Sequence, residues 1–132
     1  MFVIYRLGAY ARNLRKEVVK AGKWYFYDNG IRNAIIGNFR PLAVRQDVGE
    51  LWESYLIGER IKANHNEGLG KEFYFWRTYD GQEIDLIEES ANTLNAFEIK
   101  WGDKNPSIPK VFAENYPNVV YQVINRSNYL GV

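Results

Sequence analysis

Residues 72–101 read EFYFWRTYDGQEIDLIEESANTLNAFEIKW, and this stretch decides the fold. Three runs, at residues 72–78, 82–88 and 94–101, are rich in aromatic and branched side chains and are long enough for strands. Tyr79-Asp80-Gly81 has the chemistry of a hairpin turn, and residues 89–93 supply a second turn. The stretch therefore predicts three consecutive strands joined by hairpins.

Side chains alternate between the two faces of a strand, so Glu98 and Lys100 share one face of the third strand. Asp85 lies in the second strand, and hairpin pairing can bring it onto the same face as Glu98. Two carboxylates at such a short distance repel each other unless a cation neutralises them. Mg²⁺ or Mn²⁺ would take oxygen ligands from Asp85 and Glu98, from the Ile99 carbonyl and from water. Lys100 could then orient or help deprotonate an attacking water and stabilise charge on a phosphate, which is phosphodiesterase chemistry.

The stretch is flanked by helices. Asp47 is expected as the N-cap of a helix, with Glu50 three residues later. One side of this helix carries residues at helical spacing, namely Val48, Leu51, Trp52, Tyr55, Leu56 and Glu59. Glu53 lies at the border of that side. This helix should end within residues 64–70. A loop at 102–106, a helix at 107–116 with Pro109 in its first turn, and a buried strand at 119–124 follow. Residues 46–132 thus form a core of helix, three strands, helix and strand.

Residues 1–45 are predicted as an N-terminal extension of the same single domain. Strands are expected at 1–10 and 23–27, with a short helix at 11–20 between them. Residues 28–30 supply a turn and helix cap, and a short helix at 31–36 ends at Gly37 before a connector at 38–46.

Composition limits the chemistry. The chain has 132 residues and is 46% hydrophobic, which suits one globular domain. It has no cysteine and one histidine, so disulfides, thiolate zinc sites and cysteine nucleophiles are excluded. No apolar run is long enough for a membrane span and no leader pattern is present, so we expect a cytoplasmic protein.

The formal net charge is only +1, so any binding of DNA must use a local basic patch. Arg77 and Lys104 are candidates for contact with nucleic acid, together with Lys62, Lys71 and Lys110. Scattered lysines and arginines of this kind are more often ordinary surface charge.

The order of elements, with Glu-Ile-Asp-Leu at 83–86 and Phe-Glu-Ile-Lys at 97–100, resembles the PD-(D/E)XK nuclease superfamily. The resemblance implies a restriction-endonuclease-like α/β core, with a central mixed sheet flanked by helices on both faces. It implies metal ligation by Asp85 and Glu98, catalytic assistance by Lys100, and for Glu53 the role of the first-helix glutamate. Ile84 stands where the superfamily name has proline, and the helix at 107–116 carries no glutamine motif.

A longer pattern at residues 25–36, 49–53, 75–85 and 98–100 resembles the carboxy-terminal domain, of unknown function, of a widespread prokaryotic AAA+ ATPase family. That resemblance implies an ATPase module upstream in a longer chain. The present chain has no Gly-x-x-x-x-Gly-Lys-Ser/Thr motif with which to bind ATP in that manner.

Three functions stay open from the sequence. The domain is a Mg²⁺-dependent deoxyribonuclease, or a catalytically inactive binding or regulatory module of the ATPase. Residues 1–45 and exposed aromatic side chains could also build a homodimer interface. On the plainest interpretation, Glu98 and Lys100 form a strand ion pair and Glu53 is a helix-surface residue.

Overall fold

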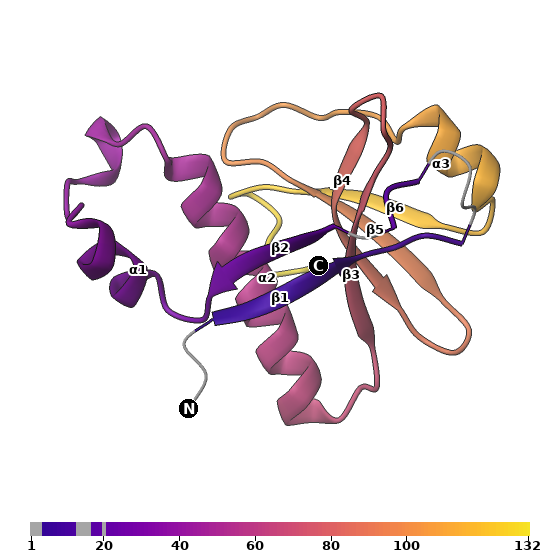
Figure 1. The fold of residues 1–132 in the computed structure, drawn as a ribbon, viewed down its shortest axis with the longest axis horizontal. Coiled ribbons are helices and arrows are strands. Elements are labelled where there is room, and N and C mark those ends of the chain that lie inside the picture. Colours follow the sequence, from indigo (N-terminus) through magenta and orange to yellow (C-terminus); the bar gives the residue numbers. More distant parts are fainter. Residues whose placement is uncertain (1–3, 13–16, 20) are drawn as a thin grey trace.

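The computed structural model describes residues 4–12, 17–19 and 21–132. Its centre is one six-stranded sheet in the order β2-β1-β3-β4-β5-β6 (Figure 1). The strands are β1 (Ile4–Ala9), β2 (Gly22–Phe26), β3 (Glu72–Arg77), β4 (Glu83–Glu89), β5 (Leu94–Ile99) and β6 (Val120–Ile124). The helices are α1 (Asn29–Ile36), the 3₁₀ turn η1 (Leu42–Val44), α2 (Val48–Glu67) and α3 (Lys110–Asn115).

The predicted three-stranded unit is confirmed. β3 pairs antiparallel with β4, and β4 pairs antiparallel with β5. Gly81 adopts φ 94° in the turn between β3 and β4, a left-handed conformation that glycine enters without steric cost. β6 runs parallel to β5, and β1 runs parallel to β3 and antiparallel to β2. The sheet is therefore mixed and the fold α/β, as expected.

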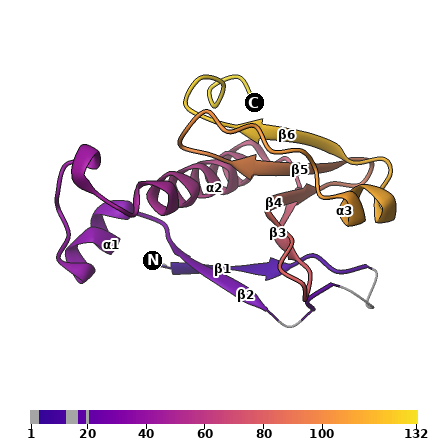
Figure 2. The ribbon, with the colours of Figure 1, turned by 90° about the horizontal axis from the view of Figure 1, so that it is seen from above.

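Apolar clusters lie on both faces of the sheet. Helix α2 inserts Leu56 and Ile57 into a cluster with Leu7, Phe75, Leu86, Phe97, Ile99 and Ile124. Helix α3 inserts the fully buried Phe112 into a second cluster with Tyr10, Trp76, Ile84, Ile87 and Ala96. Burial of one such aromatic side chain contributes about 2–3 kcal/mol. The helices thus cover opposite faces of the sheet (Figure 2).

A β-bulge interrupts β4 at Asp85. Tyr74 pairs with Ile87 but Trp76 pairs with Ile84, so two steps on β3 face three on β4. Ile84 and Ile87 consequently share the α3 face, and Leu86 lies on the α2 face. An extra residue of this kind re-aims the neighbouring side chain, so strict alternation does not predict the direction of Asp85.

The helix expected at 11–20 is wrong for the described part of that range, because 11–12 and 17–19 are not helical. Glu17 instead forms a β-bridge with Thr78. Its buried carboxylate accepts hydrogen bonds from the Trp76 indole, the Tyr116 hydroxyl and the Arg12 amide. These tertiary bonds outweigh a weak local helical preference. The expectations for residues 1–3, 13–16 and 20 lie outside the described residues.

The helix ends match the sequence signals in part. Asp28 caps α1 by accepting from the amides of Gly30 and Ile31, and Gly37 ends α1 with φ 70°. Asp47 occupies the N-cap of α2, but its side chain caps no amide, because Arg45 and Arg32 bind the carboxylate. The predicted capping box is therefore absent.

The helices also differ from expectation in two details. Helix α3 is shorter than 107–116, and Pro109 is its N-cap rather than part of its first turn. In α2, Tyr55 and Glu59 are exposed whereas Ser54 and Gly58 are buried, since these small residues allow the helix to approach the sheet. Among the described helices, none has the length and apolar character needed to cross a membrane.

Candidate functional site

Asp85 and Glu98 meet where the β4–β5 ladder ends. The register pairs Leu86 with Phe97, which places the preceding Asp85 next to the following Glu98. The Ile99 amide donates a hydrogen bond of 2.9 Å to Asp85 Oδ2. A side-chain oxygen thus takes the place of a backbone carbonyl in the ladder, and the carboxylate of Asp85 is held beside β5.

Glu98 is buried, with 8% of its surface exposed. Burial raises the pKa of Glu98 to about 9, and hydrogen bonding with Asp85 and repulsion by its charge add to that rise. Lys100 opposes it, with Nζ 3.9 Å from Glu98 Oε2. Without a further cation, the Glu98 carboxyl therefore keeps its proton at neutral pH.

Glu53 reaches the same region from α2. The Tyr25 hydroxyl donates to Glu53 Oε1 at 2.7 Å, and Lys23 Nζ lies 3.8 Å from the same oxygen. Burial and then the charge of Asp85 raise the pKa of Glu53, while the Tyr25 hydrogen bond and Lys23 lower it. The three predicted carboxylates therefore interact electrostatically.

Lys23 links this group to a fourth carboxylate, because it also pairs with Glu83 at the start of β4. Arg77 lies 3.6 Å from Glu83 and stacks over the Phe75 ring, so this candidate for phosphate contact already has a protein partner. Lys104, the other candidate, is exposed in the loop between β5 and α3.

The donor set fits a site built on two carboxylates. Within 4–12, 17–19 and 21–132, no three His, Cys, Asp or Glu side chains are arranged to hold one ion. Mg²⁺ in proteins is commonly held by one or two carboxylates, with water and substrate phosphate completing its shell. Asp85 and Glu98 meet that requirement, and a buried carboxyl pair that repels itself is stabilised by such a charge. Glu53 stands beside the pair, bound to protein groups.

Sequence reasoning missed four members of this site: Lys23, Tyr25, Glu83 and Tyr121. Burial, then Glu98 and Asp85, raises the pKa of Tyr121 to about 12, which places this β6 residue beside the pair. The alternation of Lys23 and Tyr25 in β2 was a visible signal that they share a face. No signal in the sequence indicated that Lys23 and Tyr25 would contact Glu53, a helix residue far along the chain.

A hollow of about 420 Å³ opens beside Glu53. Its walls come from β2, α1 and α2, and they consist of Lys23, Trp24, Tyr25, Phe26, Arg32, Glu50, Glu53 and Ser54. The hollow thus lies at edge strand β2, and Glu53 is the member of the acidic group that lines it.

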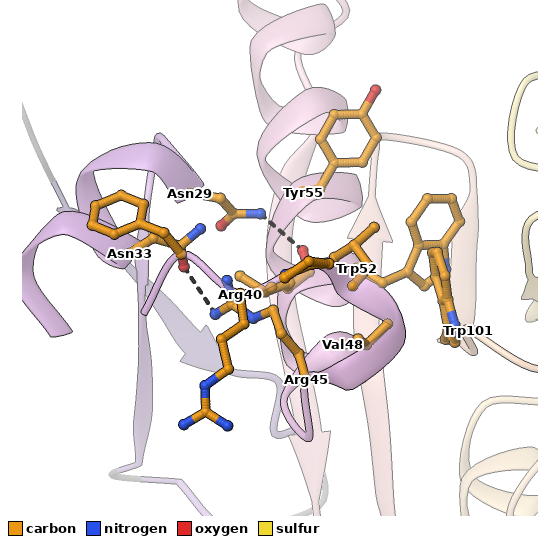
Figure 3. Close-up of a pocket in the computed structure, with 12 residues that line it drawn as sticks. Asn29, Asn33, Arg40, Arg45, Val48, Trp52, Tyr55 and Trp101 are labelled. Carbon is orange, nitrogen blue, oxygen red and sulfur yellow. Dashed lines mark hydrogen bonds between the residues drawn. The ribbon is translucent and has the colours of Figure 1, made fainter. Parts of the chain in front are cut away.

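A second hollow, of about 500 Å³, lies between α1, the segment 39–45 and α2, with Trp101 on its far side (Figure 3). None of the described residues in its walls carries a carboxylate. Asn29 donates to the Leu51 carbonyl and Arg45 donates to Asn33, so these polar groups serve the fold. This apolar hollow does not supply the acid, base or ligand groups that the first one adjoins.

The comparisons with known proteins match two segments of the chain to different families. Residues 48–129 match a family described as a domain of unknown function (DUF4143), and residues 1–42 match a second domain of unknown function (DUF8612). Uncharacterized proteins of Mycobacterium tuberculosis and Mycobacterium bovis are each 27% identical over 110 residues, which is 82% of this chain. The match covers 24% of each mycobacterial protein, so the chain spans about a quarter of the length of these curated relatives.

No solved structure matches the chain. The first family match covers most of the sequence, including Glu53, Asp85, Glu98 and Lys100. The chain therefore belongs to the DUF4143 family, whose members share a domain of unknown function.

Proposed function

We propose that this domain is a divalent-metal-dependent nuclease-like module that hydrolyses phosphodiester bonds of nucleic acid. The observation that carries the proposal is the contact of the Asp85 and Glu98 carboxyl groups, with the Lys100 ammonium 3.9 Å from Glu98. The proposal includes a restriction-endonuclease-like core, and a place as the carboxy-terminal module of an AAA+-type ATPase. The greater length of the mycobacterial relatives leaves room for such a module in them.

Each residue has a defined task in this proposal. Asp85, held by the Ile99 amide, and Glu98 bind the ion, which when bound supplies Lewis-acid stabilisation of phosphate charge. Lys100 orients the attacking water and stabilises negative charge on the phosphate. Water oxygen bonds to phosphorus, the ester P–O bond breaks, and the leaving oxygen takes a proton from solvent water. Glu53, fixed by Tyr25, accepts a proton from the water.

Incubation of the purified chain with single-stranded, duplex and branched DNA in Mg²⁺ or Mn²⁺ tests the reaction. We expect Lys100→Ala and Asp85→Asn each to slow cleavage about 10²-fold or more, because each removes a group that stabilises the transition state. Arg40→Ala is the matched control, since it deletes an exposed cation that lines the other hollow. Equal cleavage by all four proteins would refute the assignment.

A catalytically inactive binding module is the second candidate. It is favoured by the engagement of Glu53 with Tyr25 and Lys23, which leaves Asp85 and Glu98 as the described carboxylates available to an ion at this site. Calorimetric titration with Mn²⁺ separates the two functions. If the domain is a nuclease, Mn²⁺ binding should strengthen from pH 6 to pH 9, because the ion displaces the Glu98 proton. The Glu98→Gln variant should not bind the ion. Absence of binding over this range favours the module.

A further inference from the structure

The outer face of the β1–β2 ribbon exposes an aromatic side chain beside an arginine. Trp24 is 63% exposed, far more than a tryptophan used for packing. The register pairs Arg6 with Trp24 across the ribbon, so the two side chains leave the sheet on the same face. Leu7, one residue on, points the opposite way into the cluster under α2.

Gly22 extends this surface by leaving room for Arg6. A Cβ atom on Gly22 would lie 2.3 Å from Arg6 Nε, so the guanidinium lies directly over the glycine. Arg6 donates one hydrogen bond to the Ala21 carbonyl and makes no ion pair with any described acidic residue. Trp24, the guanidinium and the flat glycine therefore form one continuous surface, here called the Trp24 surface (Arg6, Gly22 and Trp24).

No described helix or strand covers the Trp24 surface. Figures 1 and 2 show α2 behind the ribbon and open space in front of it. Helix α3 packs against the other half of the sheet, around Trp76 and Phe112. Trp24 therefore lies on a face of the ribbon that no described helix or strand covers.

The charge of this part of the chain favours an anionic partner. Residues 1–27 contain six Arg or Lys and one Glu, although the whole chain has a net charge of only +1. That single acid, Glu17, is fully buried among Trp76 and Tyr116. The described strands β1 and β2 carry Arg6 and Lys23 and no acidic residue. Lys23 points to the inner face, where it pairs with Glu53 and Glu83. Arg6 is therefore the strand cation that the outer face offers to an anionic partner.

The surface is also connected to the acidic site. Trp24 and Glu53 both line the hollow of about 420 Å³ at the free edge of β2. Lys23 and Tyr25 flank Trp24 in the strand and contact Glu53 on the inner side. A ligand that lies on Trp24 can pass around this edge to reach the carboxylates.

We propose that the Trp24 surface binds single-stranded nucleic acid, with an unpaired base stacked on the indole and a neighbouring phosphate on the Arg6 guanidinium. Aromatic side chains stack any base, and arginine contributes both charge and a planar face. This proposal rests on the proposed function, because it specifies the substrate, single-stranded nucleic acid, and the side of the sheet from which that substrate approaches. Duplex DNA offers no unpaired base to Trp24.

Fluorescence anisotropy with labelled oligothymidine and oligouridine, in EDTA to prevent cleavage, tests this binding. We expect Trp24→Ala to weaken binding about 10-fold and Trp24→Phe to retain most of it, because one stacked base is lost or kept. Gly22→Ala should weaken it as well, since the new methyl displaces the flexible end of Arg6. Phe39→Ala is the matched control, for Phe39 is 72% exposed and lies at the other hollow. The two oligonucleotides decide between DNA and RNA.

Each outcome is decisive, and failures of the two proposals differ. Equal affinity of wild type and Trp24→Ala overturns the Trp24 surface, and cleavage that still requires Asp85 then leaves the nuclease standing. Trp24-dependent binding without any cleavage leaves the surface standing and removes the nuclease. Absence of oligonucleotide binding, together with a Trp24-dependent dimer in light scattering, would assign the surface to a second copy and overturn it. Far-UV circular dichroism checks that each variant is folded.

Discussion

The proton on Glu98 makes the acidic pair sensitive to pH. Its pKa of about 9 in the folded chain lies above the ordinary value of 4.5, mainly because of burial. Between these values the unfolded chain has lost the proton and the folded chain retains it. The folded state therefore binds more protons, and the free energy of unfolding must fall as the pH rises from about 4.5 to 9.

Glu98→Gln should remove this loss of stability with rising pH, because glutamine occupies the same volume and does not ionise. We expect the variant to gain stability relative to wild type as the pH is raised from 5 to 9. Thermal unfolding in EDTA across that range measures the difference. Glu59→Gln, at a half-exposed position on α2, is the control and should follow wild type. Parallel curves for wild type and Glu98→Gln would show that Glu98 ionises normally.

At the scale of secondary-structure elements, glycine has opposite effects on stability at positions 37 and 49. Gly37 ends α1 with φ 70°, and no atom lies near a Cβ built there. Glycine is therefore needed at position 37 for its backbone conformation and not for space. Gly49 lies in the first turn of α2, also with open space around it, and has an ordinary helical φ.

Gly37→Ala should destabilise the chain by about 1 kcal/mol, because alanine is strained in the left-handed region. Gly49→Ala should leave stability unchanged or raise it by up to about 1 kcal/mol, because alanine is the better helix former. Urea unfolding of both variants measures the two effects. A change of the same sign in both would contradict the conformational explanation.

Elements with strong local signals were predicted well from the sequence. The strands at 72–101 and the helix from Asp47 have clear periodicity and turn residues, and the structure contains β3, β4, β5 and α2 there. The helix at 11–20 failed because the partners of Glu17 are distant along the chain. Tyr116 is 99 residues from Glu17, and no pattern in residues 11–20 contains that bond.

At the scale of the whole molecule, the N-terminal strands are part of the central sheet. β1 lies between β2 and β3, and Leu7 is buried in the cluster that also contains Leu56 and Phe75. Arg60 of α2 pairs with the buried Glu88 of β4, and Lys71, directly before β3, pairs with the same carboxylate. The two matched segments, 1–42 and 48–129, therefore share one core.

The shared core predicts a single cooperative unfolding transition. Tryptophan fluorescence and far-UV circular dichroism should give the same midpoint in urea, because β1 cannot leave the sheet without exposing Leu7 and its neighbours. Amides of β1 should exchange with deuterium about as slowly as those of β3. Two separate transitions, with early loss of β1 protection, would indicate that residues 1–45 fold independently.

Local sequence specified the strands of the hairpin unit, the helix that precedes them and the neighbourhood of Asp85 and Glu98, because hairpin partners are close along the chain. Three-dimensional packing decided the bulge that directs Asp85, and it brought Lys23 and Tyr25 to Glu53, which is 28 residues from Tyr25. It also left Trp24 uncovered. The positions of Lys23, Tyr25 and Trp24 depend on the parallel pairing of β1 with β3, a contact between distant segments that no periodicity within either segment encodes.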